Sequence, residues 1–154
     1  MLHCHVFFKE DRNRDASELI KKYESGERDF RGAILKGIDL AYKELNEIDL
    51  QGADLSGADL YGAILSRANL SKANLSKVNF GNTTMGNTNM SEANLSNADF
   101  KEAYLESVDF SGADLTGADF FGANLLNANL ETTTVDRTLF MGAYTAGAKL
   151  PRLF

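Results

Sequence analysis

The chain of 154 residues has one cysteine, one proline and no tryptophan. The single cysteine excludes an internal disulfide, so packing alone must stabilise the fold. No apolar run approaches the roughly 18 residues that a membrane-spanning helix needs. The apolar start, residues 1–8, is short and is followed at once by charged residues, which argues against a signal peptide. We therefore expect one cytoplasmic domain without membrane contact.

Histidine is also scarce, since the chain contains only His3 and His5. The rest of the chain lacks an imidazole that would act as a general base, and its aspartates recur at regular intervals instead of forming a pair. We predict no enzymatic activity and no cofactor. His3, Cys4 and His5 are metal-ligand types, but two or three ligands at a terminus do not complete a tetrahedral site. We expect an edge strand or a loose terminus there, without a metal.

The net charge of −6 is unevenly distributed. Residues 1–26 hold five acidic and five basic side chains, whereas residues 27–154 hold seventeen acidic and eleven basic ones. This excess of acid disfavours direct binding to nucleic acid, which needs clustered lysine and arginine. The simplest interpretation is that the charge keeps a small domain soluble.

The strongest pattern in the sequence is a period of five. Leu, Phe, Met or Val occupies 24 of the 25 positions that are multiples of five between Phe30 and Leu150, and Thr145 is the exception. This period fits neither a helix nor a flat strand, because neither would gather these side chains on one side. If the chain turns a corner after each pentapeptide, every apolar residue, which we call a centre, points inward.

The other positions keep the same register. The residue two before a centre is small or β-branched, as in Ala53 and Ala58, and suits a tight interior. The residue one before a centre is usually Asp or Asn and is expected to point outward beside a turn. Glycine often stands two residues after a centre, as in Gly52, where a corner needs a permissive backbone.

A second period of 20 residues separates four phenylalanines: Phe80, Phe100, Phe120 and Phe140. Four pentapeptides per coil would stack these rings in one column. We therefore predict an all-β solenoid, a right-handed quadrilateral parallel β-helix of about six coils, about 4.8 Å apart. The segments GADLSGADLYGAIL (52–65), RANLSKANL (67–75) and SGADLTGADFFGANL (111–125) resemble those of pentapeptide-repeat proteins. The segment YESGERDFRGAIL (23–35), which leads into the repeats, resembles that of cyanobacterial members of the family. The resemblance implies the same fold.

The ends of such a solenoid expose its core and need caps. Asp15 and Glu18 are spaced as a capping box, so we predict a helix from Ala16 to Ser25, ended by Gly26. Its apolar residues Leu19, Ile20 and Tyr23 would cover the first coil. Leu150, Pro151, Leu153 and Phe154 would close the last coil. The division is thus 1–26 for the N-terminal segment and capping helix, 27–150 for the β-helix and 151–154 for the C-terminal end.

One segment departs from the Ala and Leu pattern. Thr83 and Thr88 take small interior positions, and Met85 and Met90 are centres. The segment is either a recognition patch rich in Asn and Thr, or a local adjustment in which the hydroxyls bond backbone and methionine fills space. We favour the adjustment.

The register also predicts an apolar stripe. Around one corner, the outward positions carry aromatic and aliphatic side chains in place of Asp, Asn or Ser. The predicted stripe consists of Tyr42, Tyr61, Ile64, Tyr104, Phe121, Met141 and Tyr144. A contiguous apolar band marks either a contact surface for a protein partner or a second copy, or rings that pack on each other and stabilise the stack.

A second candidate surface is the acidic column Asp39, Asp59, Asp99 and Asp119, which Asn79 interrupts. Such a column would imitate DNA phosphates toward a DNA-binding enzyme such as gyrase. The family members that act on gyrase in this way are generally longer and dimerise through a C-terminal helical module that this sequence lacks. Our leading hypothesis is therefore a structural or protein-interaction module, with DNA mimicry as the alternative.

Overall fold

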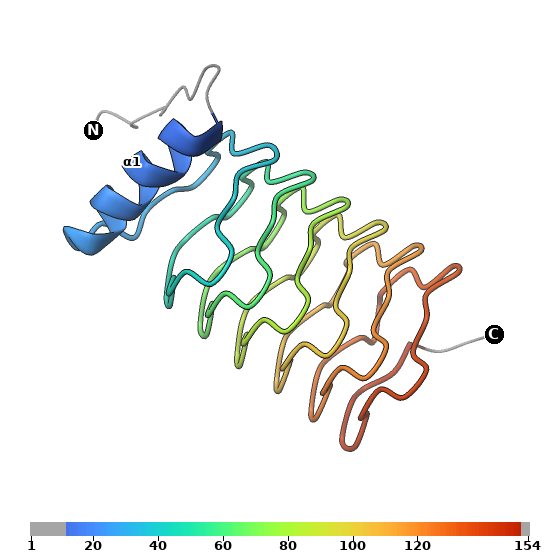
Figure 1. Cartoon of the computed structure of the whole chain (residues 1–154). Helices are drawn as coiled ribbons and strands as arrows, with labels where there is room; N and C mark the ends of the chain where they lie inside the picture. The colour runs from blue at the N-terminus through green and yellow to red at the C-terminus, as the bar shows by residue number, and fades with distance from the viewer. Residues whose placement is uncertain (1–11, 152–154) are drawn as a thin grey trace.

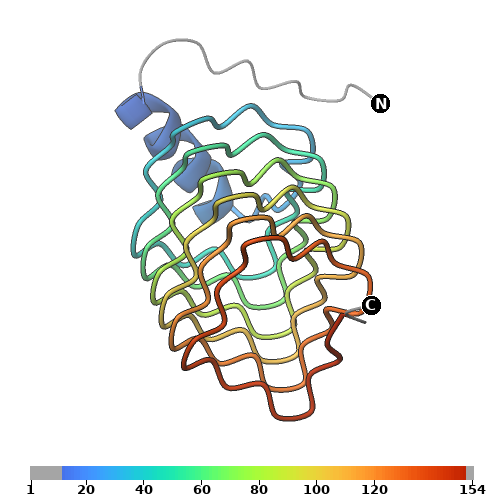
Figure 2. The same cartoon turned by 90° about the vertical axis from the view of Figure 1, so that its right-hand side faces the viewer.

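The computed structural model describes residues 12–151 (Figure 1). It begins with helix α1 (Arg12–Glu24), and the chain then winds as a stack of coils that leads away from the helix. Parallel bridges join each outward residue to the residue 20 positions later, from Asp29↔Asp49 to Asn129↔Lys149. Each 20-residue coil contributes four such positions, and the coils lie on one another in register (Figure 2). The predicted 20-residue β-helical repeat is therefore present.

The coils contain bridges of single residues, and residues 12–151 include no longer strand. A β-turn follows every centre from Phe30 to Phe140, as where the Ala33 N–H donates to the Phe30 carbonyl at 3.2 Å. The third residue of that turn, Gly32, has a φ of 67°, as a type II turn requires. Because a turn recurs every five residues, no extended strand forms within residues 12–151. The β-structure that was predicted is therefore present only as ladders of single-residue bridges.

The turn imposes a positive φ even where glycine is absent. Among residues 12–151, thirteen non-glycine residues take this corner conformation, including Tyr42 (φ 59°) and Asn82 (φ 54°). Each costs roughly 1 to 2 kcal/mol relative to a relaxed backbone, less for Asn. Hydrogen bonds to neighbouring coils fix the corner, as where the Tyr42 N–H donates to the Tyr61 carbonyl at 2.9 Å. The stack therefore overrides local preference.

The interior follows the predicted register. All centres from Phe30 to Leu130 are buried, and so are the residues two positions before them, except for the exposed Arg28 and Lys43 at the N-terminal end of the stack. The phenylalanine column is continuous: ring centroids lie 4.9, 4.7 and 5.2 Å apart along Phe80, Phe100, Phe120 and Phe140, with nearly parallel planes. The core is thus a ladder in which each side chain contacts equivalents above and below.

The segment with Thr83 and Thr88 belongs to this core. The Thr83 hydroxyl donates to the Phe80 carbonyl at 2.6 Å, and the Thr88 hydroxyl donates to the Leu65 carbonyl at 2.8 Å. Met85 is fully buried, as is Met90. The recognition-patch interpretation is wrong for these four side chains, because none of them is accessible to a partner.

Helix α1 covers the N-terminal end of the stack (Figure 1). Leu19 is fully buried, Ile20 packs against the core, and the Tyr23 hydroxyl donates to the Asn46 carbonyl at 2.9 Å. The predicted start at Ala16 is wrong, since the helix already includes Arg12 and Asp15 lies inside it. Arginine has a high helix propensity, and the helix already includes the residues before Asp15. The capping-box spacing of Asp15 and Glu18 therefore did not mark the start of the helix.

The predicted role of Gly26 in ending the helix is confirmed, although the last helical residue is Glu24 and not Ser25. Gly26 has a φ of 101°, its N–H donates to the Tyr23 carbonyl at 3.0 Å, and the Glu27 N–H donates to the Lys22 carbonyl at 3.1 Å. These two bonds form a Schellman motif, which satisfies carbonyls that the helix leaves without partners.

The C-terminal coil is less well covered. Val135, Phe140, Ala143 and Ala148 are only partly buried, and Leu150 is 52% exposed. Leu150 therefore does not cover the last coil as predicted. Leu153 and Phe154, like His3, Cys4 and His5, lie outside the described residues. Within residues 12–151, no helix combines the length and apolar character needed to cross a membrane.

Candidate functional site

The acidic column points outward, but its carboxylates are part of the turns. Asp39, Asp59, Asp99 and Asp119 each accept the backbone N–H two residues later, at 2.9 to 3.0 Å. Asn79 makes the same bond to Gly81 and also donates to Asp59 at 3.1 Å. These side chains therefore satisfy the N–H groups of the corners, which gives them a structural role.

Lys101 reduces the charge of the column at its centre. Its ammonium lies 3.1 Å from Asp99 Oδ2 and 3.2 Å from Asp119 Oδ2. The hydrogen bonds to Asp99 and Asp119 raise the pKa of Lys101, so the lysine stays charged. A row of uncompensated negative charges, which phosphate mimicry requires, is thus broken by Asn79 and Lys101.

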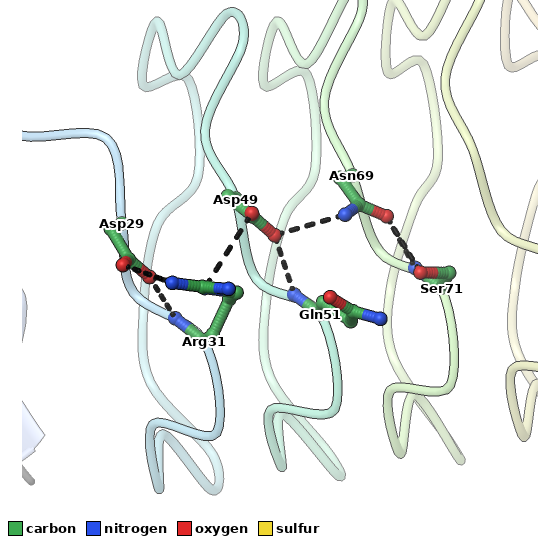
Figure 3. Close-up of polar contacts among 6 residues, drawn as sticks. All are labelled: Asp29, Arg31, Asp49, Gln51, Asn69 and Ser71. Atoms are coloured by element: carbon green, nitrogen blue, oxygen red, sulfur yellow. Dashed lines mark hydrogen bonds and ion pairs between the residues drawn. The ribbon is translucent and has the colours of Figure 1, made fainter. Parts of the chain in front are cut away.

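Another face carries a ladder of polar side chains that bond mainly to each other (Figure 3). Arg31 pairs with Asp29 at 2.7 Å and lies 3.8 Å from Asp49. Asn69 donates to Asp49 at 3.0 Å, and the Ser71 hydroxyl donates to Asn69 at 2.7 Å. Bonds within and between coils therefore occupy much of this polar face.

The N-terminal part of the apolar stripe stabilises the stack. Tyr42 and Tyr61 meet edge to face with centroids 5.6 Å apart. The Tyr42 ring lies over Gly62, where an added Cβ would come within 2.7 Å of it, and the Tyr61 ring lies over Gly81. Asn82 donates to the Tyr61 hydroxyl at 3.0 Å. These contacts match the packing alternative for Tyr42 and Tyr61, and Ile64 beside them is only partly exposed.

The C-terminal part of the stripe differs from Tyr42, which is also 73% exposed, in having no ring pair like that of Tyr42 and Tyr61. Tyr104, Phe121, Met141 and Tyr144 are exposed, Met141 by 72% and Tyr144 by 73%. Neither Tyr104, Phe121 nor Tyr144 has an aromatic ring neighbour within the described residues. Tyr104 and Tyr144 belong to one bridged ladder, with Asn124 between them. These rings are placed where a partner can reach them.

The stripe is not contiguous, and it includes a residue that the sequence prediction missed. Gly81, Thr84 and Lys101 separate its two parts. Leu139 is 55% exposed and ends the acidic ladder, paired with Asp119. The sequence did contain a signal, since Leu139 stands one residue before a centre, where the pattern expects Asp or Asn. The predicted stripe did not include the ladder to which Leu139 belongs. The exposed group, called the apolar patch below, consists of Tyr104, Phe121, Leu139, Met141 and Tyr144.

The described residues offer little chemistry beyond these contacts. They contain no group of three or more His, Cys, Asp or Glu side chains arranged to hold a metal ion. A groove between α1 and the first coil is lined in part by two basic residues, Lys21 and Lys43, and two acidic residues, Glu24 and Asp39. Because its charges are mixed, the groove does not indicate a ligand of either sign.

Several solved structures are similar to this chain. Rfr23, a pentapeptide repeat protein of the cyanobacterium Cyanothece 51142, is 25% identical over 87% of this chain and 98% of its own, with a TM-score of 0.53. A pentapeptide repeat protein of Nostoc is 30% identical over 83% and 93%, with a TM-score of 0.42. One from the Arabidopsis thaliana thylakoid lumen is 33% identical over 60% and 61%, with a TM-score of 0.48. A comparison with curated proteins gives no match.

The family profile decides the assignment. The profile described as the pentapeptide repeat region matches residues 53–130, slightly more than half of the chain. Those residues contain the middle coils, with their buried centres and outward Asp and Asn ladders. Proteins of this kind form right-handed β-helices. The chain belongs to the pentapeptide-repeat family.

Proposed function

We propose that the protein is a non-catalytic interaction module and that the apolar patch is its contact surface. The observation that carries the proposal is the exposure of five large apolar side chains on neighbouring ladders near one end of the rod. Isolated exposed apolar residues are common, whereas a group on neighbouring columns is typical of a protein contact. The rigid ladder beneath would hold the patch in one arrangement, which lowers the entropy cost of binding.

The test compares Tyr104→Glu and Tyr144→Ser with the control Tyr42→Ser. All three change exposed tyrosines, but Tyr42 belongs to the ring pair that stabilises the stack. Each variant is immobilised and used to capture proteins from the source cell, and circular dichroism verifies its fold. We expect the patch variants to lose partners that the parent and Tyr42→Ser retain. Identical captured proteins and identical sedimentation for patch variants and parent would refute the proposal.

The alternative function, charge mimicry of DNA toward an enzyme such as gyrase, has less support. The acidic column favours it, but Asn79 and the Lys101 ion pairs reduce its charge. A supercoiling assay with purified gyrase tests it directly: inhibition or protection at micromolar protein would favour mimicry, and no effect would exclude gyrase as its target.

The finer description of the fold is also a proposal. Four bridged positions per coil support a quadrilateral cross-section, and the ladders from Asp29 to Lys149 span six 20-residue periods. The end of α1 at Glu24 supports the division into a capping segment (1–26), a β-helix (27–150) and a C-terminal end (151–154). The cytoplasmic location stays a prediction.

A further inference from the structure

The coil of residues 131–150 leaves backbone groups unpaired that are paired in the coils before it. The N–H of every centre from Phe30 to Leu130 donates to the carbonyl 19 residues later, as from Leu130 to Lys149 at 2.7 Å. The N–H groups of Val135, Phe140 and Thr145 make no such bond within residues 12–151. A row of unpaired backbone groups is a template for pairing with another chain.

The same coil holds much of the exposed apolar surface. Eight large apolar side chains are exposed within the described residues, and four of them belong to this coil: Leu139, Met141, Tyr144 and Leu150. The Phe140 ring is only partly buried and stacks on Phe120 alone, at 5.2 Å. A partner that continued the stack would bury interior side chains such as Phe140, which a partner on the side of the rod does not reach.

The distribution of charge favours a second copy at this coil. Each copy carries a net charge of −6, so two copies repel each other over much of their surface. Residues 131–150 hold two acidic and two basic side chains and have no net charge, whereas the two preceding coils, 91–110 and 111–130, carry −4 and −2. Two copies therefore meet at residues 131–150 without net repulsion.

One corner of this coil carries both signs on adjacent residues. Arg137 Nε lies 3.9 Å from Asp136 Oδ2, and the two side chains are 86% and 72% exposed. Neither makes another ion pair within the described residues. A two-fold axis through this corner, perpendicular to the rod, would place Asp136 of each copy opposite Arg137 of the other. The corner is thus self-complementary, as an interface between identical copies requires.

We infer that residues 131–150 are a self-association surface, on which a second copy of the chain docks coil against coil with the Asp136–Arg137 corner on the two-fold axis. The axis reverses the direction of the second copy, so the facing backbones run antiparallel. Helix α1 covers the opposite end of the stack (Figure 1), which prevents head-to-tail growth, and the assembly closes at two copies. The contact goes beyond the proposed function, since it needs neither another protein nor the side of the rod.

Sedimentation of the full chain over a range of concentrations tests the inference. We expect the parent to dimerise, and Asp136→Arg and Arg137→Asp each to raise the dissociation constant about tenfold or more, because like charges then face each other twice. An equal mixture of the two variants should dimerise about as well as the parent, since opposite charges again meet. The control Lys77→Asp makes a similar charge change at the equivalent corner three coils away and should leave the dissociation constant unchanged.

Hydrogen exchange identifies the edge itself. The Phe140 and Thr145 amide protons should exchange more slowly as the dimer forms, because they become paired. A parent that stays monomeric, a dimer that both charge variants retain, or a mixture that fails to restore the dimer would overturn the inference. A dimer that Tyr104→Glu abolishes while both charge variants retain it would assign self-association to the apolar patch instead. Loss of captured partners in Tyr104→Glu with an intact dimer would support both proposals as separate surfaces.

Discussion

Replacing Phe100 by alanine tests how the solenoid is held together. Phe100 is fully buried in the middle of the phenylalanine column. Its ring stacks on Phe80 at 4.9 Å and on Phe120 at 4.7 Å, and meets Phe110 edge to face at 5.8 Å. Phe140 in the last coil provides a matched control, since it stacks on Phe120 alone, at 5.2 Å, and is only partly buried.

The expected magnitudes differ between the two sites. Removal of a buried phenylalanine ring typically costs about 3 to 5 kcal/mol, because transfer free energy is lost and a cavity remains. Each aromatic pair adds about 0.5 to 1.5 kcal/mol beyond area burial, so Phe100→Ala should lie at the upper end of the range. Phe140→Ala loses one pair and less burial, and we expect about half as much or less.

Urea denaturation followed by circular dichroism measures both variants against the parent. The slope of the free energy of unfolding against urea shows whether the whole solenoid still unfolds as one unit. A lower slope for Phe100→Ala would indicate that the two halves of the stack unfold separately, as nearest-neighbour stabilisation permits. If Phe140→Ala costs as much as Phe100→Ala, contacts from both sides do not govern the stability of a coil, and our reasoning is refuted.

Three further predictions concern single contacts. Thr88→Val should reduce the free energy of unfolding by about 0.5 to 1.5 kcal/mol in the same assay, because it removes the hydrogen bond to Leu65; an unchanged value would contradict a stabilising role for that bond. Gly62→Ala should lower the free energy of unfolding by about 0.5 to 1.5 kcal/mol more than Gly57→Ala does. Both positions have a positive φ, but only Gly62 lies under the Tyr42 ring. The difference between the two variants should vanish in a Tyr42→Ser background. Burial alone would raise the pKa of Asp54, but hydrogen bonds from Ser56 and the Lys36 ammonium lower it below its ordinary value. Because the folded-state pKa is the lower one, this carboxylate stabilises the fold above its ordinary pKa of about 4 and loses that contribution as the pH falls through the lowered pKa. The stability difference between parent and Asp54→Asn should therefore shrink as the pH falls below about 4.

The sequence was a sufficient guide wherever a property repeats. The centres, the small interior residues and the phenylalanine column were all predicted from spacing, because each coil repeats the environment of the coil before it. Prediction failed where the repeat stops. Helix α1 begins at Arg12 instead of Ala16, and Leu150 is exposed instead of covering the last coil, because the spacing of the repeat carries no information about segments outside it.

The candidate surface required the tertiary structure. The sequence determined that Tyr61 and Tyr144 stand at outward positions, because the register of five fixes which side chains leave the core. It did not determine their roles, since these depend on the side chains one coil away. Tyr61 has Gly81 beneath its ring and Asn82 at its hydroxyl, whereas Tyr144 lies near the open end of the stack with no ring beside it among the described residues. Contacts between coils join residues about 20 positions apart, and only the folded stack shows which of those contacts the side chains make.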